Sequence, residues 1–115
     1  MENYSKLDAS FHALADPTRR AVIARLTQGS APVKELAAPF TIGLPAFLKH
    51  LKVLEESGLV TSQKTGRVRT CRLEISRLAT IEAWLGEQCA HWEARTDRLA
   101  DYVETRMSGK DDYDG

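Results

Sequence analysis

The sequence predicts a mainly α-helical domain of about five helices with one small β-hairpin, and two stretches carry this prediction. Between Val33 and Leu73 the chain has the pattern of a short helix, a tight turn, a second helix rich in Lys and His, and two basic strands. From Ser76 to about Arg106, apolar residues recur at the spacing of one long helix. At 115 residues the chain has the length of one domain.

Two helices are expected ahead of this region. The first spans Ser5–Ala15, and its apolar residues at helical spacing are Leu7, Phe11 and Leu14. The second runs from Pro17 to about Gln28, because Asp16 is suited to cap its N-terminus and proline favours the first helical position. Its expected buried residues are Val22, Ile23 and Leu26.

A helix-turn-helix pattern follows. Val33–Phe40 is a short third helix, Thr41–Gly43 is the turn, and the fourth helix runs from Leu44 to about Ser57. Thr41 is a candidate N-cap of the fourth helix, and Pro45 lies within its first turn. The expected buried residues of this helix are Phe47, Leu51 and Leu54.

The two strands are Leu59–Lys64 and Arg67–Leu73, and Thr65-Gly66 between them is a compact turn signal. A helix-turn-helix that continues into such a hairpin is the pattern of a winged helix-turn-helix fold. The sequence therefore predicts about five helices and a two-stranded wing.

The last predicted helix, from Ser76 to about Arg106, would span about 45 Å, which is longer than a domain of this size can cover. Its apolar positions are Leu78, Ile81, Leu85, Cys89, Trp92, Leu99 and Val103. A second copy of the chain is the expected cover, so we predict a homodimer. Residues 1–106 form the predicted DNA-binding and dimerisation domain, and the acidic segment 107–115 is expected to be a disordered tail.

The net charge of the chain is zero, but the charges are unevenly distributed. From Leu44 to Leu73 there are six cations and two anions, a net charge of +4, whereas the residues from Glu74 to the end carry a net charge of −5. A phosphate group is attracted by the electrostatic field of the protein charges near it rather than by the total charge of the chain. The neutral total therefore does not exclude a nucleic acid as partner.

The basic middle of the chain supplies the candidate DNA contacts. Lys49 and Lys52 lie opposite the buried face of the fourth helix, and the small residues at its N-terminal end allow close approach to base edges. Arg67 near the hairpin tip is suited to pair with phosphate, whereas Arg72 fits a structural role better. The alternatives for these cations are a solvated helix face and a charge-protected strand edge. The predicted DNA contacts are Thr41, Gly43, Leu44, Pro45, Ala46, Lys49, His50, Lys52, Lys64, Arg67 and Arg69.

Several motifs together resemble one known family. Ala13–Arg20, with the sequence ALADPTRR, is similar to the N-terminal signature of the ArsR-type (ArsR/SmtB-like) winged-helix repressors. Leu44–Ala46 and Lys49–Val60 resemble that family's recognition helix and its exit into the wing. The motifs occur in order over about residues 7–99, nearly the whole ordered chain.

The resemblance implies a homodimer built from the first and last helices, which represses transcription by occupying an operator and is released when a signal binds. The expected interface residues are Leu7, Phe11, Leu85, Trp92, Leu99 and Val103. Two recognition helices about 34 Å apart would read an imperfect palindrome. The expected partners are double-stranded DNA, a second copy of the chain and, as an open alternative, a small-molecule or protein effector.

One position departs from the family pattern. The family has a small hydroxyl residue two positions before the helix histidine, and here that position is Leu48. Leucine can pack beside Leu44 and Leu51, so the predicted fold is unaffected. The substitution puts one of the family's DNA contacts in question.

The metal sensors of this family carry a Cys-x-Cys pair on the third helix, where this chain has Ala37 and Pro39. His91 and Glu93 are the candidate ligands for a second metal site that the family has on its last helix. They are two residues apart and so point to different faces of that helix. A structural metal site needs about four converging donors. We therefore expect no metal site and no cofactor.

The chain has two isolated cysteines, Cys71 and Cys89, and each is interpreted as a small buried hydrophobe. A metal- or thiol-responsive repressor on the same scaffold remains the alternative.

No phosphate-binding loop and no nucleophile–base set points to an enzyme. No apolar run reaches the ~18 residues of a membrane span and no secretion signal is visible, so a cytoplasmic protein is expected.

Overall fold

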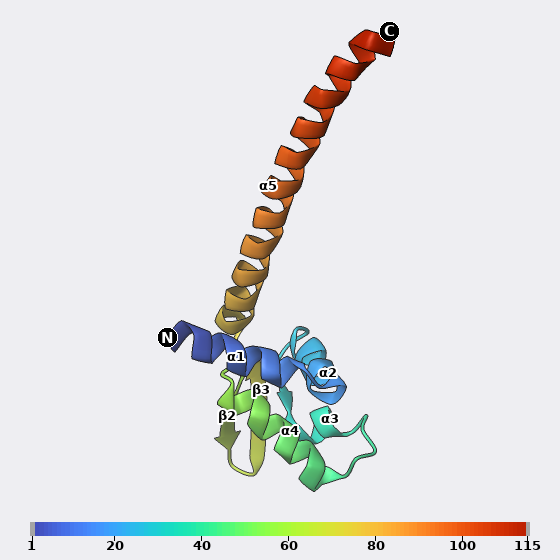
Figure 1. The fold of residues 1–115 in the computed structure, drawn as a ribbon. Coiled ribbons are helices and arrows are strands. Elements are labelled where there is room, and N and C mark those ends of the chain that lie inside the picture. The colour runs from blue at the N-terminus through green and yellow to red at the C-terminus, as the bar shows by residue number, and fades with distance from the viewer. Residues whose placement is uncertain (1, 115) are drawn as a thin grey trace. The chain divides into compact units, whose positions relative to one another are not determined.

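The computed structural model describes the backbone of residues 2–114 and the side chains of residues 5–106. This part of the chain forms five helices and a three-stranded sheet (Figure 1). The elements are α1 (Glu2–Leu14), α2 (Pro17–Leu26), β1 (Ala31–Pro32), α3 (Val33–Ala37), α4 (Leu44–Glu56), β2 (Val60–Thr65), β3 (Val68–Leu73) and α5 (Ile75–Asp114). The predicted winged helix-turn-helix fold is confirmed.

The chain divides into two units, Met1–Ile81 and Glu82–Gly115, and α5 contributes to both. The hydrophobic core lies in the first unit, and the predicted buried faces of the second and fourth helices are confirmed. The buried apolar residues are Ala13, Val22, Ile23, Leu26, Ala31, Leu36, Phe47, Leu51, Leu54, Leu59, Val60, Cys71 and Ile81. Each large side chain buried in this way contributes about 1.5–3 kcal/mol, so the core fixes the position of α4 firmly.

The segment Ala13–Arg20, with the sequence ALADPTRR, caps both of the helices that it joins. The carboxylate of Asp16 accepts a hydrogen bond of 3.1 Å from the backbone N–H of Arg19, which confirms the predicted N-cap of α2. Partial burial raises the pKa of Asp16, but the backbone hydrogen bond from Arg19 and the charge of His50 outweigh it and lower that pKa.

Two arginines of the same segment, Arg19 and Arg20, cap the C-terminus of α1. The Nε of Arg19 donates to the carbonyl of Ala13 at 2.7 Å, and Nη2 of the same side chain donates to the carbonyl of His12 at 3.1 Å. Nη1 of Arg20 donates to the carbonyl of Leu14 at 2.8 Å. These bonds add to the satisfaction of the last carbonyls of α1, of which that of His12 also accepts from the backbone N–H of Ala15. Arg19 therefore has a structural role.

The turn between α3 and α4 differs from the prediction at both ends. The third helix ends at Ala37 rather than Phe40, because Pro39 has no N–H to continue the helical bonding. The N-cap of α4 is Gly43, with a φ of 83° and no side-chain hydrogen bond, so the predicted cap by Thr41 is wrong. Glycine adopts this left-handed conformation without the steric cost of a Cβ.

The sheet has the strand order β1-β3-β2 with both pairs antiparallel, and β1 was not predicted. It is two residues long, and Ala31 pairs with Cys71 on the edge of β3 that β2 leaves open. A strand so short, with a proline that cannot donate, gives no periodic signal and is tolerated only at a sheet edge.

The hairpin turn lies one residue later than predicted. Thr65 pairs with Val68, so the two loop residues are Gly66 and Arg67. Gly66 has a φ of 63°, which suits the first loop position of a tight hairpin. As a result Arg67 stands at the tip of the wing.

The first and last helices extend beyond their predicted bounds. Helix α1 begins at Glu2 rather than Ser5, and α5 begins at Ile75 and continues to Asp114 rather than ending near Arg106. The side chains of residues 107–115 lie outside the described residues, and the division of the chain at residue 106 stays a prediction.

Candidate DNA-binding surface

Helix α4 presents two opposite faces. Phe47, Leu51 and Leu54 are buried, whereas Pro45, Lys49 and Lys52 are exposed on the other side, as predicted. Within the described part of the chain, the charge partner of this exposed face is Glu56, whose Oε1 lies 3.8 Å from Nζ of Lys52. An exposed pair of this kind is worth less than about 1 kcal/mol, so it does little to hold the lysine away from a ligand.

His50 is half-buried on the flank of α4 that faces α2. Its Nδ1 lies 3.0 Å from Nη1 of Arg19 and 3.7 Å from Oδ2 of Asp16. Both contacts use Nδ1, and Nε2 takes part in neither of them. One nitrogen of His50 therefore anchors α4 to α2, and a DNA contact by His50 stays a prediction.

The wing is attached to α4 by an ion pair. The guanidinium of Arg69 on β3 donates from Nη2 to Oε1 of Glu55 and from Nε to the hydroxyl of Ser62, the latter at 3.0 Å. All three side chains are partly buried. Arg69 was predicted as a DNA contact; its Nε and Nη2 fasten the sheet to α4, and a DNA contact by Arg69 stays a prediction.

Replacing Glu55 with Gln is expected to loosen the wing, because a partly buried arginine loses its carboxylate. We expect the free energy of unfolding to fall by about 1 kcal/mol and the amides of β3 to exchange faster with solvent. Urea denaturation and amide hydrogen exchange measure the two effects. Glu56→Gln removes an equal charge from the exposed side of α4 and should change the free energy of unfolding by less than about 0.5 kcal/mol. Equal effects of the two variants would contradict this role of Glu55.

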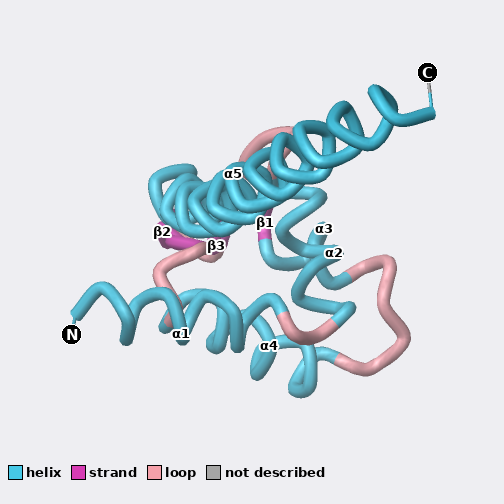
Figure 2. The backbone as a smooth tube through the Cα atoms, turned by 45° about the horizontal axis from the view of Figure 1, so that its top comes forward, coloured by secondary structure: helices cyan, strands magenta, loops and turns pink. Residues whose placement is uncertain are grey.

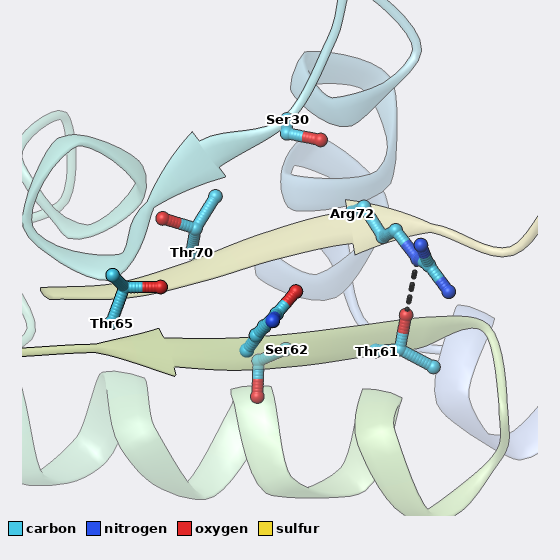
Figure 3. Close-up of a pocket in the computed structure, with 7 residues that line it drawn as sticks. Ser30, Thr61, Ser62, Thr65, Thr70 and Arg72 are labelled. Atoms are coloured by element: carbon cyan, nitrogen blue, oxygen red, sulfur yellow. Dashed lines mark hydrogen bonds between the residues drawn. The ribbon is translucent and has the colours of Figure 1, made fainter.

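The tip of the wing is exposed. Lys64 and Arg67, both predicted as DNA contacts, lie there with exposed side chains. Arg72 has the structural role that we preferred: Figure 3 shows its bond to Thr61, at 2.9 Å, and its Nε also lies 3.1 Å from Oε1 of Glu74. The hydroxyl of Thr61 and the guanidinium of Arg72 together hold the pKa of Glu74 below its ordinary value.

A polar recess of about 430 Å³ lies on the sheet. Figure 3 shows the side chains that line it. Its lining residues are Ser30, Thr61, Ser62, Gln63, Thr65, Thr70 and Arg72. Hydroxyl and amide groups with one paired arginine do not make a nucleophile–base arrangement.

The loop between α3 and α4 (Figure 2) carries further predicted contacts. Thr41, Gly43 and Leu44 are exposed and Ala46 is half-buried. Leu48 is exposed and lines a recess next to the wing, and its packing beside Leu44 stays a prediction.

Lys34 on α3 is an exposed cation that lines the same recess as Leu48 and Arg67. Lys34 was not among the contacts predicted from the sequence. The signal that could have found it is a cation on the helix that precedes the turn.

The predicted interface residues differ between the two units. In the first unit, Leu7 of α1 packs partly against the core, and Phe11 is exposed. In the second unit, large apolar side chains of α5 are exposed along its length. They are Trp84, Leu85, Trp92, Leu99, Tyr102 and Val103.

Along α5, the positions of Leu85, Cys89, Trp92, Leu99 and Val103 follow alternating spacings of three and four residues, with Thr96 completing the series. This repeat of about 3.5 residues is the pattern of a helix that packs lengthwise against another helix. We call this series the α5 seam. Trp92 on the seam is 68% exposed in the single chain.

The two cysteines differ in their exposure to solvent. Cys71 is buried, as predicted, and its burial together with the charge of Glu55 raises the pKa of the thiol. A protonated, inaccessible thiol is a poor nucleophile. Cys89 is exposed, so its interpretation as a buried hydrophobe is wrong for the single chain. Among the described residues, no three His, Cys, Asp or Glu side chains come together in a way that could hold a metal ion.

Comparisons with known proteins give a matching family model and several relatives. A family model described as a helix-turn-helix domain matches residues 14–63. The HTH-type transcriptional regulator Rv2034 of Mycobacterium tuberculosis is 40% identical over 81 residues, which are 70% of this chain and 76% of the relative. The transcriptional repressor SdpR of Bacillus subtilis is 30% identical over 75 residues, which are 65% of this chain and 83% of the relative.

A solved structure is closer in sequence. The crystal structure of the ArsR family transcriptional regulator RHA00566 matches with a TM-score of 0.74 and 53% identity, covering 77% of this chain and 92% of that chain. Within the described part of our chain, no helix is both long enough and apolar enough to cross a membrane. The sequence identities, the shared fold and the exposed lysines of α4 agree, and the chain belongs to the ArsR family of winged helix-turn-helix, DNA-binding transcriptional regulators.

Proposed function

We propose that this regulator is a homodimeric repressor that binds an imperfect palindromic operator without a metal cofactor. Helix α4 enters the major groove with Lys49 and Lys52, and the wing tip places Lys64 and Arg67 at the adjacent backbone. The observation that carries this proposal is that these four cations are exposed. Their basic neighbours Arg19, Arg69 and Arg72 are instead held by groups of the protein.

The α5 seam supports the homodimer. A soluble protein rarely leaves a continuous apolar surface uncovered, and a second seam of the same kind is the simplest complement. A symmetric dimer presents two recognition helices, and a spacing of about 34 Å would match one turn of DNA. The operator would then consist of two related half-sites.

The proposed signal is not a metal ion. Ala37 and Pro39 offer no side-chain donors where the family's metal sensors have cysteines. A small molecule, a partner protein or the concentration of the regulator itself would then set occupancy of the operator. Stoichiometric metal in the purified protein would refute this part of the proposal.

Selection of duplexes from a random-sequence pool tests the proposed function directly. We expect the bound pool to converge on an inverted repeat, and the purified protein to bind that duplex far more tightly than unselected DNA. A protein that stays a single chain at micromolar concentration and ignores duplex at low ionic strength would refute the proposal.

Replacing Arg67 with Ala should reduce the dependence of operator affinity on salt. Each phosphate contact releases a counterion, so the slope of log K against log salt should fall by about one unit per half-site contact. Fluorescence anisotropy over a series of salt concentrations measures the slope. Arg20→Ala is the matched control, because Nη1 of Arg20 bonds to the carbonyl of Leu14 instead. An unchanged slope in Arg67→Ala would reject the contact at the wing tip.

A further inference from the structure

Three apolar side chains interrupt the cationic surface formed by α4 and the wing. Leu44 and Leu48 are 54% and 37% exposed on one side of α4, and Val68 on β3 is 52% exposed. The two leucines are one helical turn apart, so their side chains lie on the same face of α4. We call these three residues the apolar strip. Single exposed apolar residues are common, but a group of them bordered by charge marks a binding surface.

The strip borders a recess of about 410 Å³ between α4 and the wing. Leu48 and Val68 line this recess, and its charged lining residues are Lys34, Arg67 and Arg69. No carboxylate is among the described residues that line it. The recess therefore combines apolar side chains with a rim of cations, which matches a ligand that has apolar groups between phosphates.

We propose that the apolar strip recognises the C5 methyl groups of thymine in the major groove of the operator. This inference rests on the proposed function, because it needs α4 to lie in the groove. The thymine methyl is the one apolar group that base pairs display there, and leucine has no hydrogen-bonding group with which to read a base in another way. Lys34 and Arg67, the exposed cations that border the strip, contact the phosphates on either side.

The position of Leu48 gives this contact a distinct consequence. A hydroxyl at this position would hydrogen-bond to a phosphate and carry no sequence information, whereas a leucine against a methyl group distinguishes thymine from cytosine. Each half-site of the operator should therefore contain at least one thymine whose methyl group contributes to affinity.

Uracil tests this contact, because it pairs like thymine and lacks only the methyl group. In the duplex selected from the random pool, each thymine is replaced by uracil one at a time, and binding is measured by fluorescence anisotropy. We expect at least one replacement in each half-site to weaken binding by about fourfold, the effect of one buried methyl group. Leu48→Ala or Leu44→Ala should abolish the difference between the thymine and uracil duplexes. Lys49→Ala should lower affinity for both duplexes and preserve their ratio.

The outcomes separate this inference from the proposed function. Specific binding of the selected duplex, with no loss at any uracil, overturns the inference and leaves the proposed function standing. A thymine preference that persists in both leucine variants also overturns it. Failure to bind any duplex selectively refutes the proposed function instead. Circular dichroism checks that the leucine variants fold, which we expect because both side chains are exposed.

Discussion

Trp92→Ala is expected to weaken dimerisation by at least about 30-fold, and operator affinity should fall with it. Trp92 is the most exposed of the large apolar residues in the described chain and lies in the middle of the α5 seam. In a symmetric dimer both copies of the side chain are lost, and large aromatic residues contribute most to such interfaces. Sedimentation equilibrium over a range of protein concentrations measures the dissociation constant.

His91→Ala is the matched control for Trp92→Ala. It is adjacent in the sequence and exposed, but it lies off the α5 seam. We expect this variant to dimerise like the unmodified protein. If Trp92→Ala also sediments as an unaltered dimer, Trp92 is not part of the interface and the seam is not where the chains meet.

Lys49→Ala is expected to lower affinity for the selected operator by about tenfold or more, and affinity for random duplex by much less. Lys49 is exposed on the face of α4 opposite the core, where its ammonium reaches base edges if the helix lies in the major groove. A base contact is lost only with the correct sequence, whereas a phosphate contact is lost with every sequence. Competition binding with operator and random duplexes measures both losses.

Two variants complete this test. Lys6→Ala removes the same charge from an exposed position of α1, so it reports the effect of net charge alone. Lys49→Arg keeps the charge but changes the donor geometry, so it should retain affinity for random DNA. Equal losses on operator and random duplex in Lys49→Ala would reduce this residue to a phosphate contact.

The sequence by itself determined the order of the five helices and the two wing strands, and the polarity of α4. Helical spacing at Phe47, Leu51 and Leu54 identified the buried face, and the exposed lysines followed from it. The cap at Asp16 was also predictable, because N-capping depends on residues that are close in the chain. These features are local, so a single sequence contains the information for them.

Only the tertiary structure decided which cations are available to a ligand. Arg67 and Arg69 look alike in the sequence, but Arg69 faces Glu55, which lies 14 positions earlier in the chain, and Arg67 stands at the tip of a turn. The strand β1 and the exposure of Leu48 depend in the same way on contacts between distant segments. Contacts of this kind are set by the packing of the sheet against α4, and no periodic pattern in the sequence predicts them.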